Sequence, residues 1–112
     1  MNLQIGNLFS HAEPPASGEH LKTLLRHRNL VIERIVSSSA VGVSEYVQAQ
    51  DEWVVLLRGK ATLRIASETV ELRAGDHVFL SAGVRHAVER VSDGALWLAV
   101  HLYPEHAPES GS

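Results

Sequence analysis

Residues 52–59, Glu-Trp-Val-Val-Leu-Leu-Arg-Gly, and residues 75–86, Gly-Asp-His-Val-Phe-Leu-Ser-Ala-Gly-Val-Arg-His, decide the fold class of this chain. Each stretch contains a short apolar run that is rich in β-branched and aromatic side chains. A glycine ends the first run, and glycine-containing turns stand on both sides of the second. Such runs are typical of short strands joined by tight turns. The middle of the chain is therefore predicted to be β-structure.

The same pattern continues toward both ends of the chain. Gly42 marks a break between two runs, and Ser92-Asp93-Gly94 separates the last two. There is no alternation of strands with helices, so a parallel sheet is not indicated. About eight short strands at this spacing favour a β-sandwich or a β-barrel. The predicted strands are residues 30–36, 43–50, 52–58, 61–66, 69–73, 77–81, 86–91 and 95–103.

The N-terminal region follows a different pattern. Residues 1–17 are predicted to form an arm because prolines and glycine interrupt them. In residues 19–27, leucines at 21, 24 and 25 have helical spacing, and Ser17 is a candidate cap. A short helix is expected there. The predicted organisation is an arm and helix over 1–29, a barrel over 30–103 and a flexible tail over 104–112.

Length and composition limit the classes of function. The chain has 112 residues, 45% of them hydrophobic, which suits one domain with its own core. It has no cysteine, so disulfides, thiolate metal sites and cysteine nucleophiles are excluded. The net charge of −3 gives no electrostatic reason to expect nucleic acid as a partner. No signal peptide or membrane-spanning run is visible, and we expect a cytoplasmic protein that does not bind membranes.

Two spaced motifs carry a resemblance to a known family. The first is Glu52, six residues and Gly59, and the second is Gly75, five residues, Ser81-Ala82-Gly83, two residues and His86. Together they resemble the two motifs of the cupin superfamily. The chain is also similar to small bacterial single-domain cupins with an RmlC-like barrel, which have Glu-Trp-Val in the first motif and Trp-Leu-Ala near the end. The resemblance implies an all-β, jelly-roll-like antiparallel barrel with an internal pocket, here with a short N-terminal helix and arm. It also implies a homodimer, formed through an edge strand and the N-terminal arm within residues 1–36.

The first motif departs from the pattern of metal-binding cupins. In those proteins a His-x-His pair, the glutamate and the later histidine hold the metal. This chain keeps only Glu52 and His86 of these four. The departures are Tyr46 and Gln48 in place of the histidine pair, Ser81 in place of a proline and Arg90 in place of the final asparagine.

A weaker metal site is nevertheless conceivable from these residue types. A carboxylate, imidazoles and an amide oxygen are ligands for Zn²⁺, Mn²⁺, Fe²⁺ or Ni²⁺. His101 lies in the last predicted strand and would restore a second imidazole if its face is the inner one. The alternative is that His101 is a buried, hydrogen-bonded strand histidine. The candidate metal ligands are Gln48, Glu52, His86 and His101.

Tyr46, Arg90 and Trp97 are candidate pocket-lining residues. Arg90 shares the face of His86 if that strand is regular, where it would pair with Glu52 or grip an anionic substrate. An outward, solvated Arg90 is the alternative.

The leading hypothesis is a metal-dependent activity on a small polar organic compound, and the sequence does not choose among oxygenase, isomerase and lyase. No catalytic residue is identified. The alternative is a metal-free, non-catalytic ligand-binding or sensor cupin.

Overall fold

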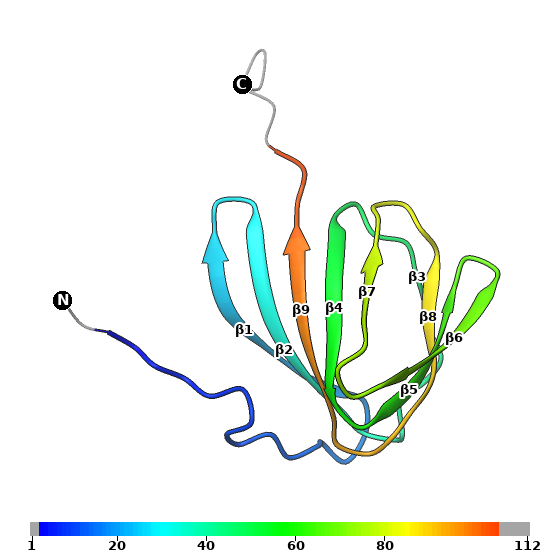
Figure 1. Ribbon diagram of the computed structural model, residues 1–112, viewed down its shortest axis with the longest axis horizontal. Helices are drawn as coiled ribbons and strands as arrows, with labels where there is room; N and C mark the ends of the chain where they lie inside the picture. The colour runs from blue at the N-terminus through cyan, green and yellow to red at the C-terminus, as the bar shows by residue number, and fades with distance from the viewer. Residues whose placement is uncertain (1–2, 106–112) are drawn as a thin grey trace.

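The computed structural model describes residues 3–105 and consists of antiparallel strands that curve into a barrel (Figure 1). Two antiparallel sheets form its walls. The first sheet has the strand order β1-β2-β9-β4-β7, and the second has the order β3-β8-β5-β6. The strands are β1 (Glu19–His27), β2 (Leu30–Ser37), β3 (Glu45–Tyr46), β4 (Asp51–Arg58), β5 (Lys60–Ile65), β6 (Glu68–Arg73), β7 (His77–Leu80), β8 (His86–Val91) and β9 (Ala95–Leu102).

The predicted all-β class is confirmed. The main core cluster takes side chains from both sheets, among them Leu56 of β4, Leu63 of β5 and Leu72 of β6. Alternation along each strand sends one row of side chains into this core and the other row outward. Across the described residues, no helix is long and apolar enough to cross a membrane.

The predicted helix over residues 19–27 is wrong, because these residues form strand β1. This strand pairs with β2, and the register shifts between Thr23 and Leu25, so Leu24 is an extra residue in the ladder. A β-bulge of this kind breaks the two-residue alternation. It leaves Leu21, Leu24 and Leu25 at a spacing that imitates one face of a helix. The pairing of β1 with β2, and not the helical spacing of the leucines, decides the structure of this segment.

The predicted strand over residues 43–50 is much shorter than expected. Only Glu45 and Tyr46 pair, with Ala87 and His86 of β8. The remaining predicted strands agree with β2 and β4–β9 to within about one residue at each end. Most of the predicted tail, residues 106–112, lies outside the described residues.

Gly59 makes the turn from β4 to β5, as the first motif requires. Its φ angle is +96°, a conformation that side chains with a Cβ rarely adopt. A Cβ at this position would lie 2.6 Å from Ser92 Oγ and 3.1 Å from Ala95 Cα. Both the backbone conformation and the close approach therefore require glycine.

Arg34 fastens the N-terminal arm to the barrel. Its side chain is buried, and its guanidinium donates to the carbonyl oxygens of Leu8 at 3.1 Å, Ser10 at 2.6 Å and His11 at 3.2 Å. Arg58 adds a hydrogen bond of 2.8 Å to the carbonyl of Ala12. Beyond these contacts the arm runs away from the barrel (Figure 1).

Candidate functional site

A pocket of about 220 Å³ lies between the two sheets. Its polar wall brings together side chains from six strands and the segment after β3. The polar lining residues are Glu19, Glu33, Tyr46, Gln48, Glu52, His86 and His101, and the apolar ones are Leu21, Ile35, Val54, Leu63, Leu80, Val88 and Trp97.

The register of the first sheet explains why these side chains meet. Glu52 of β4 stands directly opposite His101 of β9 in the antiparallel ladder. On the other side of β9, Ala99 stands opposite Glu33 of β2, one step along the same face. Residues two apart on a strand share a face, so Glu33 and His101 both point inward. The three side chains thus form a row across three adjacent strands.

Glu52 is the buried carboxylate of the pocket. It is 7% exposed, and its Oε1 accepts a hydrogen bond of 2.9 Å from Gln48 Nε2. Among the ion pairs of the described residues, the one partner of Glu52 is His101, whose Nδ1 lies 3.9 Å from Oε1. No arginine or lysine lines the pocket. The carboxylate is therefore held by a neutral amide and retains acceptor capacity toward the pocket.

His101 is hydrogen-bonded through both ring nitrogens. Nε2 lies 2.9 Å from Glu33 Oε1, and Nδ1 lies 3.3 Å from Gln50 Nε2. A carboxylate accepts and an amide nitrogen donates, which assigns the proton to Nε2 and a lone pair to Nδ1. Glu33 thus fixes the orientation and the tautomer of His101.

Two residues of the site, Glu33 and Gln50, were not predicted from the sequence. The signal for Glu33 was present, because a lone acid within the apolar run of residues 30–36 shares a face with Val31 and Ile35, which are apolar. Gln50 lies in the irregular segment before β4, where no periodicity could place it.

His86 and Tyr46 form a second polar element on the four-stranded sheet. Their rings stack with centroids 5.8 Å apart and an interplanar angle of 30°. His86 Nδ1 lies 3.2 Å from the carbonyl oxygen of Val84, which can only accept. The proton is therefore assigned to Nδ1, and Nε2 keeps a lone pair.

Trp97 forms part of the pocket wall, and a chain of two hydrogen bonds holds its indole in place. Its Nε1 donates to Ser37 Oγ at 3.2 Å, and that hydroxyl donates to Glu19 Oε2 at 3.0 Å. The indole is 4% exposed, so the hydrogen bond satisfies a buried donor.

Arg90 does not line this pocket, unlike the other six predicted site residues. In the ladder of β8 with β5, Val88 pairs with Leu63, but Arg90 pairs with Thr62, so Glu89 is an extra residue. This bulge turns Arg90 outward, where it lines a separate groove. A pocket-lining Arg90 required a regular strand, and the register of β8 agrees with the outward alternative.

The cluster does not fit an assembled metal site. In the part of the chain that the structure describes, no three His, Asp or Glu side chains are close enough to hold one ion. Glu52 and His101 approach each other, but amide groups of Gln48 and Gln50 face their lone pairs. A divalent ion would require both amides to turn their oxygens inward. The predicted role of Gln48, Glu52, His86 and His101 as ligands stays a prediction.

The pocket is acidic. Its lining contains three carboxylates, those of Glu19, Glu33 and Glu52, and no lysine or arginine. Low-dielectric walls strengthen the field of such charges. The pocket therefore favours a cation or a donor of hydrogen bonds over an anion.

A small antiparallel barrel with a polar pocket between its two sheets defines a class of proteins, the cupins. Residues 35–101 match the family described as "Cupin domain", and the chain belongs to that family.

The chain is similar to several known proteins. A solved structure from Ralstonia eutropha, provisionally described as a mannose-6-phosphate isomerase, is 34% identical with a TM-score of 0.80 and covers 91% of this chain and 100% of its own. An RmlC-like cupin from Shewanella frigidimarina has a TM-score of 0.71 at 16% identity, covering 89% of this chain and 86% of its own, and supports the fold alone. An uncharacterized protein of Streptomyces coelicolor is 29% identical over 94 residues, which are 84% of this chain and 90% of the relative.

Proposed function

We propose that this protein binds a small, neutral or cationic polar compound in the pocket between its sheets. The observation that carries the proposal is the buried carboxylate of Glu52, which has an amide donor at 2.9 Å and no lysine or arginine in the pocket lining. A ligand that donates hydrogen bonds would satisfy the remaining acceptor positions of Glu52 and the Nε2 lone pair of His86.

Size and charge narrow the class of ligand. A volume of about 220 Å³ equals the liquid volume of about seven water molecules. This suits a polyol, a small amine or an amino compound. A phosphorylated sugar, as the description of the Ralstonia eutropha protein would suggest, meets three carboxylates and no arginine or lysine in the pocket lining, and we do not propose it for this pocket.

A thermal-shift screen followed by calorimetry tests the proposal. Neutral polyols and small amines are compared with carboxylates and phosphates of the same size, on the wild type, on Glu52→Gln and on the control Glu71→Gln. Glu71 is an exposed glutamate outside this pocket. We expect neutral or cationic compounds to raise Tm, with the effect lost in Glu52→Gln and kept in Glu71→Gln. No stabilisation by any neutral or cationic compound, or undiminished binding of such a compound by Glu52→Gln, would contradict the proposal.

A divalent metal at the same pocket is the second candidate, and the Glu33–His101 hydrogen bond favours it. A carboxylate behind a histidine commonly orients that histidine as a metal ligand. Here Nδ1 of His101 lies beside Glu52 and would become available to an ion once the amide of Gln50, 3.3 Å away, turns aside. Such an ion would supply Lewis-acid chemistry.

Elemental analysis separates the two candidates. The protein is purified without chelator or histidine tag, beside Glu52→Ala and His101→Ala. Near one equivalent of metal in the wild type, lost in both variants, would establish the second candidate. No uptake after adding Zn²⁺, Mn²⁺, Ni²⁺ or anaerobic Fe²⁺ would leave the metal-free pocket as the function.

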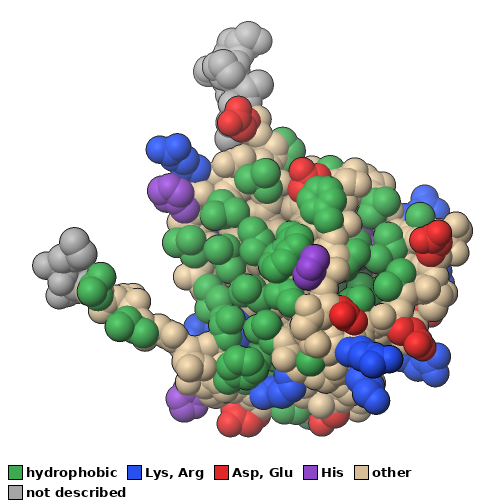
Figure 2. Space-filling view, viewed as in Figure 1, with side chains coloured by type: hydrophobic (Ala, Val, Ile, Leu, Met, Phe, Trp, Pro, Cys, Tyr) green, Lys and Arg blue, Asp and Glu red, His purple; other side chains and the backbone are tan. Residues whose placement is uncertain are grey.

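We also propose that two copies associate through the outer face of the five-stranded sheet. One cross-strand row on this face runs through Ile32, Val100, Trp53 and Phe79 of four neighbouring strands. Trp53 and Phe79 are 38% and 59% exposed. Figure 2 shows hydrophobic side chains gathered over these strands. A contiguous apolar face of this kind is typical of an interface.

The N-terminal arm supports a second copy as the occupant of this face. Ile5 is 93% exposed and Leu3 is 79% exposed, on a segment that runs away from its own barrel (Figure 1). A two-fold axis would give each arm the neighbouring apolar face, so one contact would bury both. This agrees with the homodimer that the family resemblance implies.

Sedimentation equilibrium tests the association. We expect twice the chain mass of 12.3 kDa for the wild type, a monomer for Trp53→Glu, and a dimer for the control Val47→Glu. Val47 is an exposed apolar residue that lies outside this face, in the segment that follows β3. A wild-type monomer at every concentration, or a dimer that survives Trp53→Glu, would refute the proposed interface.

A further inference from the structure

A second cavity lies away from the pocket and has the opposite charge character. It has a volume of about 890 Å³, and the strands β5, β6 and β8 form its floor. Its lining includes Lys60, Arg73 and Arg90, with the hydroxyl-bearing Thr62 between them. We refer to it as the basic groove.

The three cations of the basic groove are neighbours on one face of the four-stranded sheet. Lys60 stands directly opposite Arg73 in the β5–β6 ladder, and Thr62 stands opposite Arg90 in the β5–β8 ladder. Ala61 and Leu63 are buried, so Lys60 and Thr62 both point outward. Residues directly opposite have Cβ atoms about 5 Å apart, and diagonal neighbours about 7–8 Å apart. Lys60 is thus the direct neighbour of Arg73 and a diagonal neighbour of Arg90, and the two long arginine side chains flank a ligand held over β5 from either side.

These charges have no carboxylate partner in the described part of the chain. The ion pairs of residues 3–105 involve Arg64, Arg85 and His101, and none includes Lys60, Arg73 or Arg90. Glu89, which also lines the groove, is bound by Arg64 at 2.8 Å. The one other carboxylate in the lining of the groove is that of Glu71, against three cations.

The direct opposition of Lys60 and Arg73 is unfavourable in the absence of an anion. Like charges opposite each other across strands destabilise a sheet. An anion held between them would remove that repulsion, and the fork of Arg90 would add paired hydrogen bonds. Figure 2 shows Lys and Arg side chains gathered at the end of the molecule where β5 and β6 lie in Figure 1.

We propose that the basic groove binds the phosphate group of a phosphorylated small molecule. Lys60 and Arg73 supply charge on one side of the phosphate, Arg90 chelates its oxygens and Thr62 donates a hydrogen bond. The volume of about 890 Å³ leaves room for an organic group attached to the phosphate. This site does not require the pocket ligand, because its charged side chains are outer side chains of the four-stranded sheet, although Val88 lines both cavities.

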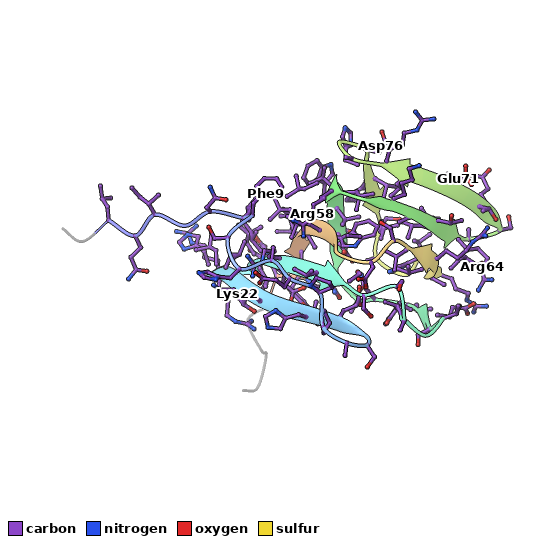
Figure 3. All side chains as sticks on the ribbon, turned by 90° about the horizontal axis from the view of Figure 1, so that it is seen from below. Phe9, Lys22, Arg58, Arg64, Glu71 and Asp76 are labelled. Atoms are coloured by element: carbon purple, nitrogen blue, oxygen red, sulfur yellow. The ribbon has the colours of Figure 1, made fainter. Side chains whose placement is uncertain are left out.

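The test is a titration of the ¹⁵N-labelled full chain with inorganic pyrophosphate at constant ionic strength, followed by amide chemical shifts. The variants are Arg90→Gln and Lys60→Gln, with Lys22→Gln as the control. Lys22 is an exposed cation on β1, and Figure 3 places it on the opposite side of the molecule from Glu71 of the groove. Because the substituted side chains are exposed, the spectra of the variants should keep the dispersion of the folded wild type.

We expect shifts concentrated at the amides of Lys60, Thr62, Arg73 and Arg90. The dissociation constant should rise at least tenfold in Arg90→Gln and in Lys60→Gln and stay unchanged in Lys22→Gln. Equal affinity in wild type and Arg90→Gln, or shifts spread over the basic residues of β1, would overturn the site. Binding of an oligoribonucleotide without binding of pyrophosphate would overturn the small-molecule assignment in favour of a polyanion.

Discussion

Replacing Arg34 with methionine is expected to lower the melting temperature and to release the N-terminal arm. Arg34 is buried and makes three hydrogen bonds to arm carbonyls. Hydrogen bonds from a charged donor contribute roughly 1.5–3 kcal/mol each. The methionine variant loses all three, while the arm carbonyls return to water as the arm detaches.

Two terms offset part of this loss. Burial of a guanidinium costs several kcal/mol of desolvation, and Arg34 Nε has no hydrogen-bond partner in the structure, which costs roughly 1–3 kcal/mol more. Methionine removes both penalties and fills a similar volume. The net destabilisation should be about 2 kcal/mol. For a domain of this size, about 4 °C per kcal/mol gives a fall in Tm of about 8 °C.

Calorimetry measures the fall in Tm, and limited proteolysis read by mass spectrometry measures the release of the arm. We expect new cleavage within residues 3–17 of Arg34→Met under conditions where the wild type stays intact. The control is Arg85→Met, which removes an exposed arginine paired with Glu45 and should change stability by less than about 1 kcal/mol. An unchanged Tm with a protected arm would show that the three hydrogen bonds do not hold the arm.

Two further substitutions test the turn and the pocket. Gly59→Ala should lower the free energy of unfolding in urea by about 3 kcal/mol, because its Cβ meets Ser92 Oγ at 2.6 Å. The control Gly75→Ala has the same φ of +96° but nothing within 4 Å of its Cβ, so it should lose only the free energy that the positive φ costs a residue with a Cβ. Equal losses in the two variants would contradict the steric argument. Glu52→Met should raise stability by about 1 kcal/mol and abolish ligand binding, because the carboxylate is retained for the ligand and not for packing. A loss of stability in calorimetry would show that Glu52 is a structural residue.

The strands could be predicted from the sequence wherever hydrophobic alternation was uninterrupted. Residues 61–66 and 69–73 alternate regularly, and β5 and β6 follow them closely. The motif glycine at 59 also predicted its turn, because the steric requirement is local. Periodicity failed where an extra residue broke it, at Leu24 in β1 and at Glu89 in β8.

The pocket could be predicted in part. Glu52 was expected at the pocket from its place in the first motif, whereas the face of His101 stayed open because the apolar run of residues 95–100 does not show which row of side chains points inward. The partners that orient these two side chains could not be predicted. Gln50 lies in an irregular segment, and Glu33 meets His101 only through the pairing of β2 with β9. The order of strands in a sheet is set by the whole fold, and no single stretch of sequence contains it.

The extra residue in β8 has a consequence for how the surface of this barrel could change over generations. It separates His86, in the acidic pocket, from Arg90, in the basic groove, along six residues of one strand. Loss of the single codon for Glu89 would restore regular alternation and leave the arginine opposite Thr62, because Val88 faces inward and the next residue along a regular strand faces outward. One deletion would thus remove the bulge while the pocket stays acidic and the groove keeps its cation, so the ligand preferences of the two sites are protected from this change.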